Sequence, residues 1–117
     1  MMTKIIAAAF LVFWAGCASA YTGADQLIKD CTVVPTKPEE AFRRIQCTGY
    51  VGGVLDAYGA VSGLYPNVNV YCAPREGISV DAAVNALVQW VRVHPENADM
   101  PSRSAILLSL KEKYPCR

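Results

Sequence analysis

The fold of this 117-residue chain is decided by residues 38–64, PEEAFRRIQCTGYVGGVLDAYGAVSGL. Pro38 suits the first position of a helix, because the N–H group that proline lacks would have no partner there. Glu39 and Glu40 follow in the first turn, where the positive end of the helix dipole favours acids. These signals predict a long central helix, and its apolar residues lie on more than one side, which indicates that neighbouring helices wrap it. These residues are Phe42, Ile45, Val51, Val54, Leu55, Tyr58 and Val61.

Gly49, Gly52 and Gly53 lie inside this predicted helix. Each interior glycine costs about 0.5–1 kcal/mol relative to alanine, so a compensating contact is expected. Gly49, Gly53, Ala57 and Ala60 form a ridge of small residues on which another backbone can approach closely. Packing within the chain is the favoured interpretation, and pairing with a second copy across a dimer interface is the alternative.

Helical patterns also precede and follow the central segment. Residues 22–31 are expected to form a helix capped by Thr22, with one apolar face made by Ala24, Leu27, Ile28 and Cys31. A third helix is expected from the cap Ser79 to about residue 94, where Pro95 disfavours helical geometry in the residue before it. Its apolar residues recur at the spacing of one face, at Val80, Ala83, Val84, Leu87, Val88 and Val91.

Pro101 is expected to start a fourth helix, which turns Ile106, Leu107, Leu110 and Tyr114 inward. Antiparallel helices with short links make a compact bundle. The sequence therefore predicts an all-α, four-helix, disulfide-stapled bundle, with room for a short extra helix.

The first 20 residues have the features of a secretory signal peptide, so residues 21–117 are expected to form the single mature domain. Lys4 precedes an apolar run that is shorter than the about 20 residues a membrane-spanning helix needs. Ala18-Ser19-Ala20 matches a signal peptidase site. Ala15-Gly16-Cys17 also resembles the end of a lipobox, which would make Cys17 a lipid anchor, but Trp14 argues against it. Export in soluble form is favoured.

An even number of cysteines remains after export, and such cysteines in a short exported chain indicate disulfides. Cys31 ends the first helix close to Cys47, near the start of the second. Cys72 precedes the third helix, and Cys116 follows the fourth. The topology therefore favours the pairs Cys31–Cys47 and Cys72–Cys116, with the other pairings still open.

The sequence predicts neither an enzyme nor a metalloprotein. The chain has 11 Lys and Arg against 10 Asp and Glu, so its charge gives no reason to expect nucleic acid or an anionic membrane as a partner. His94, the sole histidine, is interpreted as a helix C-cap rather than a catalytic base. No metal-binding Cys or His spacing and no phosphate-binding loop is present, so no cofactor is expected. Asp56, in the middle of the central helix, would need a hydrogen-bonding partner if it were buried.

Residues 65–71 combine aromatic and amide side chains with a stiffening proline. Such residues provide amphipathic contact area and hydrogen bonding in binding loops. We therefore predict a contact surface made by Tyr65, Asn67, Asn69 and Tyr71, with an ordinary loop folded back on the bundle as the alternative.

Several motifs, in matching order along the chain, resemble the Rap/Tai family of periplasmic immunity proteins. The longest is Cys47-Thr48-Gly49-Tyr50-Val51-x-Gly53-Val54-x-Asp56 in the central helix. The others are Tyr71-Cys72-x-Pro74, His94-Pro95-Glu96, Met100-Pro101 and Tyr114-Pro115-Cys116.

This resemblance implies a helical periplasmic protein, often a homodimer, that binds and sterically blocks a toxin delivered by type VI secretion. In the family the toxin is a peptidoglycan amidase. A small periplasmic acid-stress chaperone, which releases apolar surface when its carboxylates are protonated, is the alternative function. Fold-level analogy does not decide between them.

Overall fold

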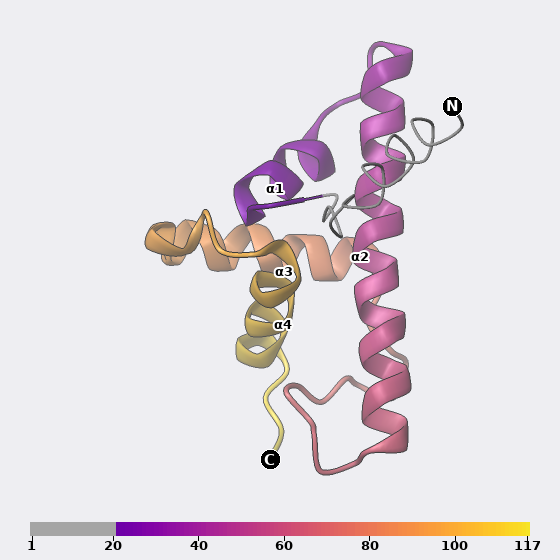
Figure 1. Cartoon of the computed structure of the whole chain (residues 1–117), viewed down its shortest axis with the longest axis vertical. Helices are drawn as coiled ribbons and strands as arrows, with labels where there is room; N and C mark the ends of the chain where they lie inside the picture. The colour runs from indigo at the N-terminus through magenta and orange to yellow at the C-terminus, as the bar shows by residue number, and fades with distance from the viewer. Residues whose placement is uncertain (1–20) are drawn as a thin grey trace, which may run out of the picture.

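The computed structural model describes residues 21–117, and this part of the chain contains helices and no strands (Figure 1). The predicted signal peptide, residues 1–20, and the alternative lipid anchor Cys17 lie outside the described residues. The elements are the helices α1 (Ala24–Thr32), α2 (Pro38–Leu64), α3 (Val80–Val93) and α4 (Ser102–Lys113), with a short 3-10 helix, Pro95–Asn97, between the last two. The predicted all-α class and four-helix content are confirmed.

The start of α1 differs from the prediction. Gly23, not Thr22, is its N-cap, and the Thr22 hydroxyl donates to the Gln26 side-chain oxygen at 3.0 Å instead. A side-chain cap is unnecessary because the segment before α4 supplies the acceptors. The N–H groups of Ala24 and Asp25 donate to backbone carbonyls of residues 100 and 98, each at 2.9 Å. By contrast, the predicted cap of α3 is confirmed, because the Ser79 hydroxyl accepts from the N–H of residue 82 at 3.1 Å.

The helices α1, α3 and α4 gather around one core on one side of α2. The closest helix pairs are α3 with α4 and α1 with α2. Two serines are the only buried polar side chains in the described part of the chain, and both are hydrogen-bonded. Ser102 donates to the Gly23 carbonyl at 3.0 Å, and Ser109 donates to the Ile106 carbonyl at 2.8 Å. The largest fully buried apolar side chains are Leu27, Val51, Leu87, Ile106 and Leu110.

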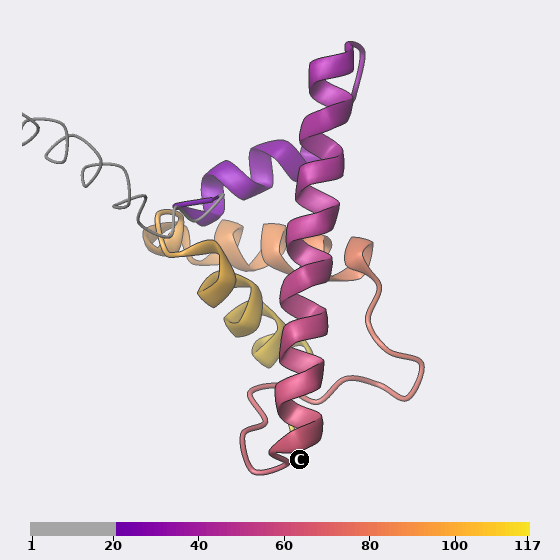
Figure 2. The same ribbon diagram turned by 45° about the vertical axis from the view of Figure 1, so that its right-hand side comes forward.

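The long helix α2 stands beside this core rather than inside it. Both views show α3 crossing α2 steeply instead of running alongside it (Figures 1 and 2). Only Cys47 and Val51 of α2 are buried. Phe42, Ile45 and Leu64 are 60%, 67% and 76% exposed. The prediction that neighbouring helices wrap α2 is therefore wrong, because steep crossing limits contact to its middle.

The glycines of the small-residue ridge of α2 have no neighbour within the described chain. A Cβ atom added at Gly49 or Gly53 would meet nothing within 4 Å. Gly52 differs, since a Cβ there would lie 3.7 Å from a methyl group of Val80 on α3. The favoured interpretation, packing of the ridge within the chain, is therefore wrong for its glycines, and Ala57 and Ala60 are exposed.

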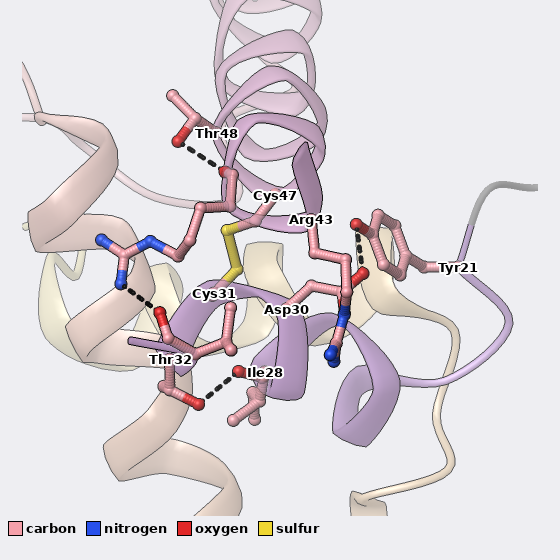
Figure 3. The surroundings of a disulfide bond; sticks show 10 residues. Tyr21, Ile28, Asp30, Cys31, Thr32, Arg43, Cys47 and Thr48 are labelled. Carbon is pink, nitrogen blue, oxygen red and sulfur yellow. Dashed lines mark hydrogen bonds and ion pairs between the residues drawn. A yellow bond between two sulfur atoms is a disulfide. The ribbon is translucent and has the colours of Figure 1, made fainter. Parts of the chain in front are cut away.

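Both favoured disulfides are present. Cys31–Cys47 joins α1 to α2, with a Cα–Cα distance of 5.2 Å, and both cysteines are buried (Figure 3). Cys72–Cys116 joins the segment before α3 to the C-terminus across a Cα–Cα distance of 4.9 Å, and both of these cysteines are exposed. One bond is therefore part of the core, and the other fastens a surface loop to it.

Polar contacts beside the first disulfide fix the start of the domain on α1 and α2 (Figure 3). The Tyr21 hydroxyl donates to one Asp30 carboxylate oxygen at 2.9 Å, and Arg43 Nε donates to the other at 2.6 Å. Burial, followed by the hydrogen bond to Asp30, raises the pKa of Tyr21 to about 12. Tyr21 therefore keeps its proton, and with it this contact, at any physiological pH.

Candidate functional site

The predicted contact loop, residues 65–71, leaves the C-terminal end of α2 at the tip of the molecule (Figure 2). Tyr65, Asn67 and Asn69 are exposed, and Tyr65 exposes 62% of its surface. The loop therefore presents one aromatic and two amide side chains to solvent, as predicted from the sequence.

Tyr71 does not belong to this exposed set. Only 5% of its surface is exposed, and its ring stacks on Tyr58 of α2 with 4.2 Å between ring centroids. Burial, with a smaller effect of Tyr58, raises the pKa of the Tyr71 hydroxyl. The prediction that Tyr71 is exposed for contact is wrong, because stacking on Tyr58 of α2 buries it and makes it an anchor of the loop.

Tyr58 is the main support of the loop, and its hydroxyl makes every hydrogen bond that one hydroxyl can make. It donates to the Tyr71 carbonyl at 2.9 Å. It accepts from the N–H groups of Val70 and Tyr71 at 2.9 and 3.2 Å. Tyr58 was predicted from the sequence only to supply apolar surface, so this role was missed. Its position about two helical turns before the loop gave no signal of which backbone groups it would reach.

The ends of the loop are also fixed by backbone hydrogen bonds. The Tyr65 N–H continues α2 by donating to the Val61 carbonyl at 2.8 Å, and the Val68 N–H donates to the Tyr65 carbonyl at 3.0 Å. Beyond the loop, the Cys72 N–H donates to the Tyr114 carbonyl at 2.9 Å, next to the second disulfide. The exposed side chains are therefore carried on a backbone with few free torsions, which lowers the entropic cost of binding.

Two hollows flank the loop. One, of about 420 Å³, has Asp56 and Asn69 among its lining residues. Asp56 is exposed, so it does not need the hydrogen-bonding partner that a buried carboxylate would require. The other hollow, of about 400 Å³, lies between α2, the loop and α4 and has a nearly apolar wall. A rigid loop between two hollows is typical of a surface that binds another molecule.

Comparison with known protein families gives a match to the Rap1a immunity proteins over residues 23–116. The chain belongs to the Rap1a family of immunity proteins. The search of curated proteins and the search of solved structures gave no match. The motifs that resembled the Rap/Tai family lie within the matched range, so that resemblance is confirmed.

In this Rap1a family member, His94 has the structural position predicted for it. Its N–H donates to the Trp90 carbonyl at 2.9 Å, which caps α3. Its ring nitrogens lie 3.6 Å from a Glu96 oxygen and 3.5 Å from a Glu112 oxygen. Within residues 21–117 no group of three or more His, Cys, Asp and Glu side chains could hold a metal ion. No helix in this range is both long enough and apolar enough to cross a membrane.

Proposed function

We propose that this protein is an exported, non-enzymatic immunity protein that binds a type VI secretion effector in the periplasm and blocks it sterically. The observation that carries the proposal is the 65–71 loop, which exposes Tyr65, Asn67 and Asn69 on a backbone held by Tyr58 and the second disulfide. Membership in a family of immunity proteins supports it.

The target is a peptidoglycan amidase or a similar cell-wall toxin. Such an enzyme binds its peptide substrate in an open cleft, and a rigid protruding loop can fill that cleft in place of the substrate. Tyrosine contributes contact area at low entropic cost, and asparagine amides both donate and accept hydrogen bonds as peptide groups do. Blocking in this way needs no catalytic group of the inhibitor.

The periplasmic location rests on the disulfides and the predicted signal peptide. Disulfides persist in the oxidising periplasm and are rare in the cytosol. Both pairs here join segments that are separate in sequence, by 16 and 44 residues. Export therefore places the protein where a cell-wall toxin acts.

The alternative function, an acid-stress chaperone, has less support. That mechanism uses carboxylates whose protonation opens the fold. Among residues 21–117 the buried polar side chains are serines, and no carboxylate is among them. Protonation at low pH would thus release no buried acid from the core.

The test uses the disulfide-bonded protein and purified peptidoglycan amidases encoded by neighbouring genes. We expect one of them to form a stoichiometric complex in high salt and to lose its activity. Replacing Tyr65, Asn67 and Asn69 together with alanine should weaken inhibition about tenfold or more, as expected for an exposed aromatic anchor and its neighbours. The matched control replaces exposed Gln89 and Arg92 on α3 and should leave inhibition unchanged. Full inhibition by the loop variant would show that the loop is not the contact surface.

We also propose that the protein is a homodimer that pairs through α2. Phe42 and Leu64 are exposed at the two ends of one face, with Gly53 midway between them. Phe42 and Leu64 of one helix lie about 33 Å apart along its axis. In an antiparallel pair of α2 helices that cross at Gly53, Phe42 of each copy would therefore lie near Leu64 of the other. Such an isologous contact would cover the face that the chain itself leaves open.

Replacing Gly53 with arginine separates pairing from folding. Nothing in residues 21–117 lies within 4 Å of a Cβ at this position, so the monomer should fold normally. We expect the wild type to sediment as a dimer at micromolar concentration and Gly53→Arg to sediment as a monomer. Gly59→Arg, equally free of neighbours but on another side of α2, is the control and should remain a dimer. A monomeric wild type would contradict the proposal.

A further inference from the structure

The apolar hollow between α2, the 65–71 loop and α4 has a wall that offers almost no polar group. Val54, Val61 and Ala57 line it from α2, and the alternating positions of Val68 and Val70 line it from the loop. Val61 and Val68 are 46% and 54% exposed, so the wall is open to solvent in the protein alone. The hollow measures about 400 Å³, within the size range of small-ligand sites. We call it the valine groove.

The tyrosine in this wall adds no free polar group. Tyr58 contributes its ring to the valine groove, while its hydroxyl is fully engaged with the backbone of residues 70 and 71. A peptide chain lying in the groove would bring N–H and C=O groups that find no partner there, and such groups are costly to bury. An alkyl chain brings none.

The exception in the wall is one cation, Arg103 of α4. It lies one helical turn before Leu107, so both side chains reach the groove from the same face of α4. Arg103 is exposed and forms no ion pair within the described residues. It also lies in the first turn of α4, which has no acid and where the helix dipole disfavours a cation. Its position therefore gives α4 no electrostatic stabilisation and leaves the charge available for an anion.

We propose that the valine groove binds a single-chain carboxylate amphiphile of the fatty-acid class. The carboxylate pairs with the Arg103 guanidinium, whose planar donors match it in two parallel hydrogen bonds. The alkyl chain lies against the valines, Leu107 and the ring of Tyr58. This site is separate from the exposed polar side chains Tyr65, Asn67 and Asn69 of the loop and does not depend on the proposed immunity function.

Calorimetric titration of the disulfide-bonded protein with octanoate, decanoate and dodecanoate tests the proposal. We expect saturable binding at one site per chain, tightening about two- to fourfold with each added methylene. Arg103→Gln should weaken decanoate binding about tenfold, because a charge-assisted pair is lost, and should leave the weaker binding of decan-1-ol unchanged. Val61→Asp should abolish binding of both. Arg92→Gln, an equal charge change at an exposed site on α3, is the control.

Three results would overturn the proposal. The first is absence of saturable fatty-acid binding to the wild-type protein. If Val61→Asp then also dissociates a dimer, the groove is assigned to a second copy of the chain. The second is unchanged decanoate affinity in Arg103→Gln together with weaker effector inhibition, which would assign the groove to the effector. The third is binding only to phosphatidylglycerol vesicles, which would identify a membrane contact. Circular dichroism of each variant confirms that it is folded.

Discussion

Replacing Cys72 and Cys116 together with alanine is expected to lower the free energy of unfolding by about 4 kcal/mol. The bond spans 44 residues. Closing a loop of that length lowers the entropy of the unfolded chain, and this entropy multiplied by the temperature amounts to about 4 kcal/mol at 25 °C. Both cysteines are exposed, so their removal leaves no hole in the core. Since small domains are stable by only about 5–15 kcal/mol, the loss is a large part of the total. Urea unfolding followed by circular dichroism at pH 7 measures it.

Comparing serine with alanine at each disulfide separates two effects: the effect of the bond on the unfolded chain and the effect of the buried side chains on the core. At Cys72 and Cys116, a serine pair should cost as much as an alanine pair, because the effect acts on the unfolded chain. Cys31 and Cys47 are only 5% and 3% exposed, so a serine pair there should cost more than an alanine pair, because it buries hydroxyls. A loss below about 1 kcal/mol for Cys72→Ala with Cys116→Ala would contradict the entropic account.

The helices and disulfides were predictable because their signals are local. Pro38 and Leu64 bound α2 as expected, and Ser79 caps α3 as expected. The order of the helices was enough to predict that Cys31 lies near Cys47. Where a tertiary contact replaced the local signal, prediction failed: carbonyls of the segment before α4 took the place of the predicted Thr22 cap.

The environment of α2 was not predictable, because periodicity shows that a face is apolar but not what covers it. Phe42 and Ile45 have the same apolar character as Val51, yet Val51 is fully buried and the other two are more than half exposed. The difference comes from the steep crossing of α3 over α2, which sequence patterns do not specify (Figure 2). A single exposed apolar residue is ordinary, whereas a contiguous patch of them is a sign of an interface.

The candidate site was only partly predictable, because residue type does not show which neighbours cover a side chain. Its composition identified the loop, and Tyr65, Asn67 and Asn69 are exposed as expected. Whether Tyr71 faces solvent or the core depends on its stacking partner, Tyr58, which lies on another element. Residue type alone therefore identified the surface but not its support.

Replacing Tyr58 with phenylalanine should weaken both the fold and the binding of the effector. The ring still stacks on Tyr71, but the N–H groups of Val70 and Tyr71 and the Tyr71 carbonyl lose their shared partner. A buried group without a partner costs about 1–3 kcal/mol, and water will compensate some of this at a half-buried site, so we expect a loss of about 2 kcal/mol. If the effector binds only the wild-type conformation of the loop, restoring that conformation costs the same free energy and weakens effector binding about 30-fold.

Hydrogen exchange distinguishes this positioning role from a general loss of stability. In Tyr58→Phe the amides of Val70 and Tyr71 should exchange faster, whereas core amides of α4 should change only by the global loss. Tyr50→Phe is the matched control, because Tyr50 lies on the same helix and packs against Tyr21 in a T-shaped ring pair. Its hydroxyl forms no hydrogen bond with another group in the part of the chain that the structure describes. That variant should change stability by less than about 0.5 kcal/mol and leave inhibition intact. Unchanged exchange at Val70 and Tyr71 in Tyr58→Phe would mean that the loop is held by its disulfide and stacking alone.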